Sequence, residues 1–291
     1  MKIYINGGLL AAEDAKVSVF DHGLLYGDGV FEGIRAYHGR IFRLEDHIQR
    51  LKSSGEAIFL NLPLSVSELS QAVVDTVRAN DLHDAYIRLI LTRGPGDLGL
   101  DLRKCKQGPT LIIIADKIEL YPEHFYDRGL TLITSSYRQK RQDQVPASVK
   151  SLNYLLNVLA RAEATRAGAQ EAILLNTEGQ VTECTGDNIF YISEGRVYTP
   201  PASAGLLEGV TRRVVMELVR DGLGHEVAVR ATTTADLYRS DEVFLTGTGA
   251  EVIAGVKIDG HTIGSGTAGP LTKKIVSLFR AYARDNGTPI R

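Results

Sequence analysis

The sequence predicts an α+β fold built from two domains. Its 291 residues exceed the length that a single hydrophobic core usually serves. In the N-terminal part, predicted strands are followed by two helices and then by further strands, an order typical of α+β domains. A polar stretch with proline and glycine then interrupts the pattern. We therefore expect a small α+β domain at residues 1–117, a linker at 118–130 and a large α+β domain at 131–291.

Turn and cap signals mark the N-terminal elements. Asn6 and Gly7 follow an apolar stretch and predict a hairpin. Ser65 and Glu68 form a capping box, which predicts the start of a helix. From these signals and the apolar periodicity we expect strands at 2–5, 30–37, 40–42, 85–92 and 110–115, and helices at 44–60 and from 65 onward.

A lysine stands just before the first predicted helix of the C-terminal part. Leucines 152, 155, 156 and 159 recur at helical spacing, with Ser151 as a candidate cap and Gly168 as a stop. Lys150 would lie at the electropositive end of this helix, where a lysine does not stabilise it. A surface lysine is the ordinary interpretation, so a chemical role needs support from elsewhere. We also expect strands at 130–134, 171–176, 181–192 and 242–246, and helices from 209 or 210 and from about 271.

Composition excludes several classes of protein. The net charge of −2 and the lack of a Lys/Arg-rich block offer no electrostatic basis for binding nucleic acid or an anionic membrane. The apolar runs are too short to cross a bilayer, and the N-terminus lacks the apolar core of a signal peptide. Cys105 and Cys184 make neither a zinc site nor a disulfide framework. We expect no metal site and a reducing, cytoplasmic compartment.

The segment from Gly94 to Gly99 matches the spacing G-x-G-x-x-G of dinucleotide-binding proteins. It follows a predicted strand, and Asp116 could serve as the ribose-binding acid. Such a site also needs a helix directly after the glycines. The residues that follow show leucines at a period of two, further glycines and Pro109, which fit no amphipathic helix. We expect a shaped loop here and no nicotinamide site.

Two glycine-containing turns could bind a phosphorylated cofactor. Gly209 and Thr211 open a predicted helix, whose bare N–H groups and hydroxyl could cradle a phosphate. The turn at 246–250 offers further amides and hydroxyls for the phosphate or for a substrate carboxylate. Taken singly, these features are better explained as an ordinary helix start and an ordinary turn.

A carboxylate and two arginines complete the set of candidate residues. Glu183 stands where a strand meets a turn, and a carboxylate facing a pyridine nitrogen would keep that nitrogen protonated. Arg35 and Arg88 lie within predicted strands, and Tyr86 shares a face with Arg88. An arginine in a strand is either an edge residue or a carboxylate ligand. Together with Lys150, these features favour a catalytic site.

Eight segments distributed over nearly the whole chain form one ordered set, at 20–37, 45–51, 85–88, 97–101, 149–154, 183–190, 206–212 and 246–251. In this order they resemble the fold-type IV pyridoxal-phosphate enzymes, and most closely the branched-chain amino acid aminotransferases. The resemblance implies a two-domain fold like that of D-amino acid aminotransferase, with pyridoxal 5'-phosphate (PLP) at the domain interface. It also implies ping-pong transamination between leucine, isoleucine or valine and 2-oxoglutarate, for branched-chain amino acid biosynthesis.

The resemblance further implies roles for individual residues. Lys150 would bind the aldehyde of the cofactor covalently and move the substrate proton, and Glu183 would pair with the ring nitrogen. The other implied cofactor contacts are Arg50, Tyr154, Asn188, Leu207, Gly209, Val210, Thr211 and Thr248. The implied substrate contacts are Tyr26, Phe31, Gly33, Arg35, Tyr86, Arg88, Leu98, Leu100, Tyr121, Gly249 and Ala250.

The implied partners are amino acids, 2-oxo acids and a second copy of the chain. Leu98 and Leu100 match a segment that reaches into the site of the partner subunit, which implies a homodimer or a larger assembly. Gly249 stands where many relatives carry alanine, so we expect a looser turn around the substrate carboxylate. The alternatives on the same fold are a D-amino acid aminotransferase, an (R)-amine aminotransferase and an aminodeoxychorismate lyase. A non-enzymatic alternative is a phosphate- or nucleotide-binding protein.

Overall fold

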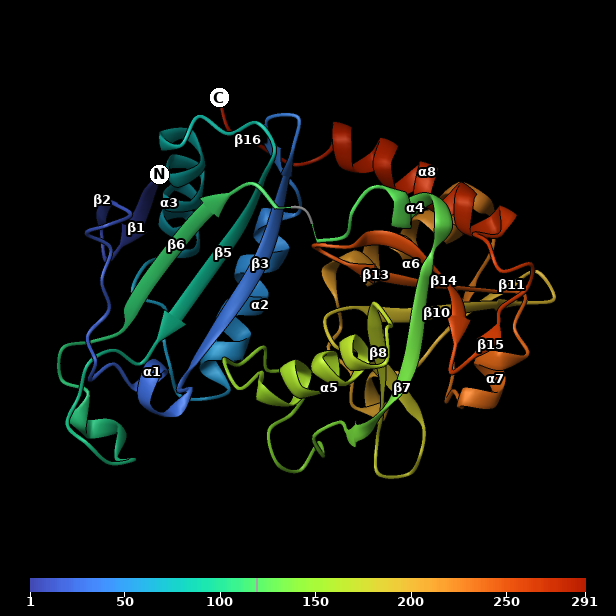
Figure 1. Cartoon of the computed structure of the whole chain (residues 1–291). Helices are drawn as coiled ribbons and strands as arrows, with labels where there is room; N and C mark the ends of the chain where they lie inside the picture. The colour runs from blue at the N-terminus through green and yellow to red at the C-terminus, as the bar shows by residue number, and fades with distance from the viewer. Residues whose placement is uncertain (119) are drawn as a thin grey trace. The chain divides into compact units, whose positions relative to one another are not determined.

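The computed structural model describes residues 1–118 and 120–291, which form two compact units (Figure 1). Unit 1 contains Met1–Ile118, Val149–Asn153 and Ala283–Arg291, and unit 2 contains the described residues of 119–148 together with Tyr154–Tyr282. These units are not identical to the domains expected from the sequence, because unit 1 also contains two segments from the C-terminal part of the chain. The expected domain boundaries therefore stay a prediction. Residue 119, in the predicted linker, lies outside the described residues.

Unit 1 is a seven-stranded antiparallel sheet with helices packed on one face. The strand order is β16-β4-β3-β5-β6-β1-β2. The strands are β1 (Lys2–Ile5), β2 (Gly8–Ala11), β3 (Gly29–Tyr37), β4 (Arg40–Ile41), β5 (Ala85–Thr92), β6 (Thr110–Asp116) and β16 (Thr288–Pro289). The helices are α1 (His22–Tyr26), α2 (Leu44–Glu56), α3 (Val66–Ala79) and the short 3₁₀ helix η1 (Leu102–Lys104). The expected helix 44–60 therefore ends four residues early.

Local signals explain why these elements form. Asn6 and Gly7 take positive φ angles of 47° and 97°, which allows the two-residue turn between β1 and β2. The side chain of Ser65 accepts from the amide of Glu68, whose carboxylate accepts from the amide of Ser65, so the predicted capping box is confirmed.

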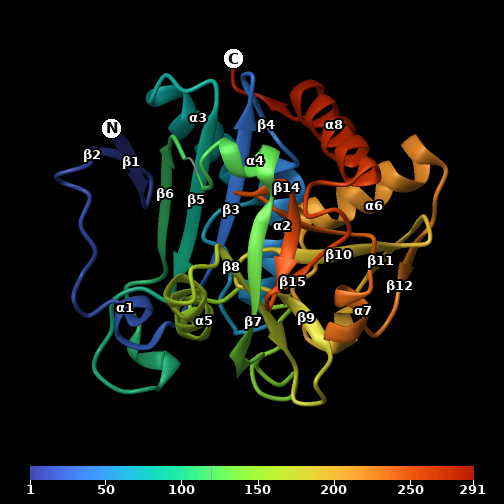
Figure 2. The ribbon, with the colours of Figure 1, turned by 45° about the vertical axis from the view of Figure 1, so that its right-hand side comes forward.

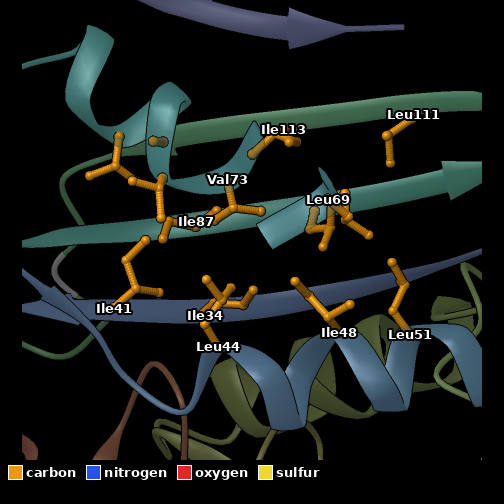
Figure 3. Close-up of a cluster of buried hydrophobic side chains, with 14 of the residues drawn as sticks. Ile34, Ile41, Leu44, Ile48, Leu51, Leu69, Val73, Ile87, Leu111 and Ile113 are labelled. Carbon is orange, nitrogen blue, oxygen red and sulfur yellow. The ribbon is translucent and has the colours of Figure 1, made fainter. Parts of the chain in front are cut away.

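The core of unit 1 lies between the sheet and the helices α2 and α3 (Figure 3). Leu44, Ile48 and Leu51 recur at helical spacing on α2 and are all but fully buried. Ile34 of β3 and Ile87 of β5 meet them from the sheet. Burying each such side chain contributes about 1.5–3 kcal/mol. Because side chains alternate along a strand, residues 31, 33, 35, 86 and 88 point to the opposite face of the sheet.

Unit 2 is a mixed sheet of nine strands with helices on its faces. The order is β12-β11-β10-β13-β14-β7-β8-β9, and β15 pairs with β14. The strands are β7 (Leu130–Arg138), β8 (Glu171–Leu175), β9 (Val181–Cys184), β10 (Asn188–Ser193), β11 (Arg196–Thr199), β12 (Val227–Val229), β13 (Glu242–Gly247), β14 (Glu251–Ile258) and β15 (His261–Thr262). The expected strand 181–192 is therefore two strands joined by a turn, because Cys184 and Asp187 close that turn by a backbone hydrogen bond.

The helices of unit 2 are α4 (His124–Arg128), α5 (Leu155–Arg166), the short 3₁₀ helix η2 (Ala202–Ala204), α6 (Val210–Leu223), α7 (Thr234–Tyr238) and α8 (Pro270–Asp285), the last three residues of α8 belonging to unit 1. Figures 1 and 2 both show α8 beside α6, where Leu278 lies against Gly222. Part of the expected linker is therefore helical, at α4. Among the described helices, none has the length and apolar content needed to cross a bilayer. Both units combine a sheet with packed helices, which confirms the α+β class.

The expected start of the helix after Lys150 is wrong. α5 begins at Leu155, with Tyr154 at its N-cap, so Ser151 is not its cap. The amide of Phe31 donates to the carbonyl of Lys150 (3.0 Å), and the amide of Leu152 donates to the carbonyl of Gly29 (2.9 Å). These bonds hold residues 150–152 extended along the start of β3, so the helix cannot begin there.

The expected core face of α5 is wrong as well. Leu155 is 70% exposed and Leu159 is 39% exposed. The buried side of the helix carries Ala160 and Ala164, which pack with Ala172 and Leu174 of β8. Small alanines let the helix lie close to the sheet, and the leucines are left on the outer surface.

Candidate functional site

Lys150 belongs to the edge of unit 1. Its backbone amide donates to Ser54 Oγ (3.2 Å) and its carbonyl accepts from Phe31, so the segment is held at both peptide groups. Its ammonium nitrogen Nζ lies 4.5 Å from the centre of the Phe31 ring. These bonds fix the point from which the side chain of Lys150 extends, and its amine lies beside the Phe31 ring.

Arg50 belongs to a buried network in unit 1. Its Nε and Nη2 donate to the two carboxylate oxygens of Glu32 (2.7 and 2.8 Å), and His47 Nδ1 donates to the same carboxylate (2.8 Å). Burial raises the pKa of Glu32, but the charge and hydrogen bonds of Arg50 and His47 outweigh it and lower the pKa to about 2. The two-point contact sets the plane of the guanidinium group.

Sequence analysis missed Glu32 and His47. Glu32 follows Phe31 in a strand whose next core-facing residue is Ile34, so an acid at this position points into the core. His47 and Arg50 are three residues apart on α2 and share a face. An acid facing the core could have been paired with this helix from the sequence. Burial lowers the pKa of His47, so the ring tends toward its neutral form.

Several predicted substrate residues lie together on the face of β3 and β5 that points away from the core of unit 1. Gly33 stands opposite Arg88, and Arg35 stands opposite Tyr86. The guanidinium carbon of Arg88 lies 4.7 Å from the centre of the Phe31 ring and 5.5 Å from that of Tyr86. This face therefore combines apolar rings with a cation.

The ring of Tyr86 lies directly over Gly33. A Cβ atom built there would lie 2.3 Å from the hydroxyl oxygen of Tyr86. The ring of Tyr86 thus occupies the space that any larger residue at 33 would need, and a substitution would displace Tyr86 from its place beside Arg88.

The loop after β5 confirms the expectation of a shaped turn. Gly94 has a φ of 88°, and a Cβ there would lie 1.9 Å from the carbonyl oxygen of Gly108. In this described loop only the three-residue η1 follows, so no helix begins directly after the glycines. Tyr26 Oη accepts from the amide of Gly99 (2.9 Å), and the flanking Leu98 and Leu100 are 63% and 79% exposed. Tyr26 thus holds the loop, and its leucines face solvent.

Glu183 of unit 2 is held by three amide donors. Its Oε1 accepts from Gln139 Nε2 (2.7 Å), and its Oε2 accepts from the backbone amide of Leu207 (3.0 Å) and from Asn188 Nδ2 (3.3 Å). Charge-assisted hydrogen bonds of this kind orient a carboxylate and favour its ionised form. Gln139 was not expected from the sequence, since it lies 44 residues from Glu183 and belongs to none of the matched segments.

Asn188 joins Glu183 to the start of α6. Its Nδ2 also donates to the carbonyl of Leu207 (2.8 Å), and its Oδ1 accepts from the amide of Gly209 (3.1 Å). A Cβ at Gly209 would lie 2.3 Å from Asn188 Oδ1, so only glycine permits this approach. One side chain therefore sets the distance between the carboxylate and the first turn of the helix.

The start of α6 fits a phosphate. Gly209 is its N-cap and supplies no side-chain acceptor to the first turn, which includes Val210 and Thr211. Those first amides have no acceptor within the helix and carry its positive end. Thr246 of β13 pairs with Asn188, and within the described chain its buried hydroxyl has no hydrogen-bond partner. Unsatisfied donors beside a glycine are what a bound phosphate would use.

The remaining predicted residues of unit 2 lie at the turn after β13 and at nearby segments. A Cβ at Gly249 would lie 2.9 Å from Leu120 Cδ2, while Thr248 is half-buried and Ala250 is fully buried. Tyr121 is buried, and its hydroxyl lies 3.2 Å from Arg161 Nη1 and 3.3 Å from Glu171 Oε2. Its role at the substrate stays a prediction.

The chain belongs to the family of class IV aminotransferases, whose model matches residues 29–258. The branched-chain-amino-acid aminotransferase of Salmonella typhimurium is 36% identical over 288 residues, which are 95% of this chain and 91% of the relative.

Two solved structures carry ligands. The branched-chain aminotransferase of Thermoproteus uzoniensis with norvaline is 36% identical, covers 100% of this chain and 99% of its own, and has a TM-score of 0.93. The branched-chain amino acid aminotransferase of Thermobaculum terrenum in its PLP form is 32% identical, covers 100% of this chain and 98% of its own, and has a TM-score of 0.90.

These similarities confirm the expected family, the fold and the aminotransferase class. They favour a branched-chain aminotransferase over the D-amino acid, (R)-amine, lyase and non-enzymatic alternatives.

Proposed function

We propose that the protein transfers the amino group of leucine, isoleucine or valine to 2-oxoglutarate, using PLP as its cofactor. One observation carries the proposal beyond family membership: Asn188 binds both Glu183 and the amide of Gly209. Asn188 thereby fixes the distance between Glu183, the partner for a ring nitrogen, and the start of α6, the binding site for a phosphate. A phosphorylated pyridine needs both groups at a fixed separation.

Different residues of the chain bind the ring and the phosphate of the cofactor. Bound PLP supplies an electron-accepting ring that stabilises negative charge on the substrate Cα. Glu183 keeps the ring nitrogen protonated, and Leu207 packs on one face of the ring. The phosphate is held by Arg50, by the first amides of α6 at Val210 and Thr211, and by Thr248. Tyr154 donates to the phenolic oxygen of the ring.

Lys150 transfers the proton of the substrate Cα. Its amine would hold bound PLP at the aldehyde carbon, with the aldehyde oxygen leaving as water, and would be free again once an amino donor is bound. The freed Nζ then removes the proton from the substrate Cα and returns it to the cofactor as a general base and acid. The same amine would serve both halves of the ping-pong reaction, in which the donor leaves as a 2-oxo acid and 2-oxoglutarate receives the amino group.

The face of β3 and β5 that points away from the core of unit 1 binds the substrate side chain. Phe31 and Gly33 offer an apolar surface for an isobutyl group, while Arg88 beside Tyr86 binds the distal carboxylate of 2-oxoglutarate. Arg35 adds a second cation on this face. The amides at Gly249 and Ala250 take the α-carboxylate, and Tyr121 completes the lining.

The chain acts as a homodimer or a larger assembly. Phe20, Leu24, Leu98 and Leu100 of unit 1 are each more than half exposed. Soluble monomers rarely leave large apolar patches in water, which supports contact with a second copy. Leu98 and Leu100 then enter the site of that copy. Sedimentation of the purified protein tests this, and a monomer at micromolar concentration would contradict it.

A cytoplasmic location is consistent with the cysteines. Cys105 and Cys184 are both free thiols in the structure, as expected in a reducing compartment.

A panel of amino donors with 2-oxoglutarate tests the activity. We expect L-leucine, L-isoleucine and L-valine to react, and D-alanine and (R)-1-phenylethylamine to be inert. A faster reaction with either of the last two would restore the corresponding alternative. The protein should also take on a yellow colour with PLP that borohydride bleaches, and a colourless protein would favour a non-enzymatic phosphate-binding role.

A further inference from the structure

Gln139 occupies a constrained place directly after β7. Its backbone amide donates to the carbonyl of Leu175 (2.8 Å), and its side chain is buried. Its Oε1 accepts from the amide of Lys140 (3.0 Å). The orientation of the side-chain amide is therefore determined, and Nε2 must be the atom that points to Glu183.

The contact between Gln139 and Glu183 is the shortest of the three described for that carboxylate. Nε2 lies 2.7 Å from Oε1, while the donors on Oε2 lie at 3.0 and 3.3 Å. Asn188 and Leu207 thus hold one oxygen, and Gln139 holds the other. Fixing both oxygens removes rotation of the carboxylate about its last bond.

The group of Gln139 that donates to Glu183 is a neutral amide, and its lack of charge affects how Glu183 can act on a ring nitrogen. A hydrogen bond to a carboxylate stabilises its ionised form. An amide does so without adding a positive charge beside it, so the negative charge of Glu183 remains able to attract a proton on a facing nitrogen.

We propose that Gln139 is a positioning residue that holds Glu183 ionised and oriented, and so maintains the proton on the ring nitrogen of bound PLP. The inference rests on the proposed function, because it assigns Glu183 to that nitrogen. It adds a residue outside every segment that carries the family resemblance.

A matched control lies in the same cavity. Gln139 and Gln142 both line a hollow of about 380 Å³, but Gln142 is exposed and donates to the carbonyl of Ala202 (2.8 Å). Gln142→Met therefore changes the same residue type in the same hollow, at an exposed position that has no contact with Glu183.

The test uses the holoenzyme with ¹⁵N-labelled PLP and follows the chemical shift of the ring nitrogen against pH. In Gln139→Met, which removes the donor at similar length, the midpoint for loss of the ring proton should fall by about one pH unit, a tenfold loss in proton affinity. The turnover number kcat for L-leucine should fall about tenfold, with KM changed less than about twofold, because only the charged state of the ring is affected. Gln142→Met should match the wild type.

Gln139→Asn gives a second route if the methionine variant folds poorly, since it withdraws the donor by about 1.5 Å and keeps an amide. Combining Gln139→Met with Glu183→Gln shows whether Gln139 acts through Glu183. In the Glu183→Gln background, replacing Gln139 should not change the pH midpoint for loss of the ring proton any further. The inference is overturned if either single variant binds PLP and keeps the wild-type midpoint and kcat, or if the effect persists without Glu183. Failure of the wild-type protein to bind PLP would instead overturn the proposed function.

Discussion

Replacing Glu32 by glutamine removes the charge that Arg50 and His47 share. Glu32 is fully buried, and its pKa is lowered from 4.5 to about 2. The difference between 4.5 and about 2 corresponds to about 3 kcal/mol at roughly 1.36 kcal/mol per pKa unit. Breaking a buried ion pair by removing one partner costs a similar amount, about 3–5 kcal/mol, because the other charge stays buried.

The sign of the pH dependence follows from the direction of the pKa change. Because the pKa of Glu32 is lower in the folded protein, its stabilisation is present above about pH 4.5 and is lost as the pH falls toward about 2. The wild type should therefore exceed Glu32→Gln in free energy of unfolding by about 3 kcal/mol at neutral pH. That advantage should shrink steadily below pH 4.5.

Urea unfolding followed by circular dichroism measures this difference at several pH values. Glu56→Gln on the same helix is the control. Glu56 is exposed, and its Oε1 lies 3.9 Å from Lys52 Nζ, a long contact at the protein surface. Surface pairs of this kind contribute about 0–1 kcal/mol. A difference between the wild type and Glu32→Gln that stays constant from about pH 7 to about pH 3 would refute the assignment of the stabilisation to an ionised Glu32.

Three further substitutions test the site. Lys150→Ala should lower transamination at least about 10⁴-fold while circular dichroism stays unchanged, and retained turnover would refute its role as the base. Glu183→Ala should keep PLP bound, as judged by absorbance, but lower kcat about 10²–10³-fold, and a near-normal rate would mean that another group protonates the ring. Gly33→Ala should displace Tyr86, whose hydroxyl lies 2.3 Å from the added carbon, and raise KM for both substrates about tenfold; an unchanged KM would place the substrate elsewhere.

The elements that were predicted well are those encoded by neighbouring residues. Asn6-Gly7 specifies its turn, and Ser65 with Glu68 specifies the start of α3, because each signal acts within four residues. In the described loop after Gly94, only the three-residue η1 follows the glycines, as the missing local helix pattern predicted.

The errors arose where distant segments compete for the same backbone. Ser151 looks like a helix cap, yet hydrogen bonds from 150–152 to the start of β3 keep it extended. The leucines of α5 look like a core face, yet the alanines on the other side of the helix pack on the sheet. Local helix propensity contributes less free energy than such tertiary contacts, so the tertiary contacts decided the backbone conformation at these positions.

The sequence by itself determined the family, the α+β class and the chemical identity of the candidate residues, because the order of eight motifs and the types of side chain are properties of the chain alone. Only the tertiary structure decided that Glu32 and His47 hold Arg50, and that Gln139 and Asn188 hold Glu183. The physical reason is that a hydrogen bond depends on distances in space, and residues 44 positions apart, such as Gln139 and Glu183, leave no periodic trace of their meeting.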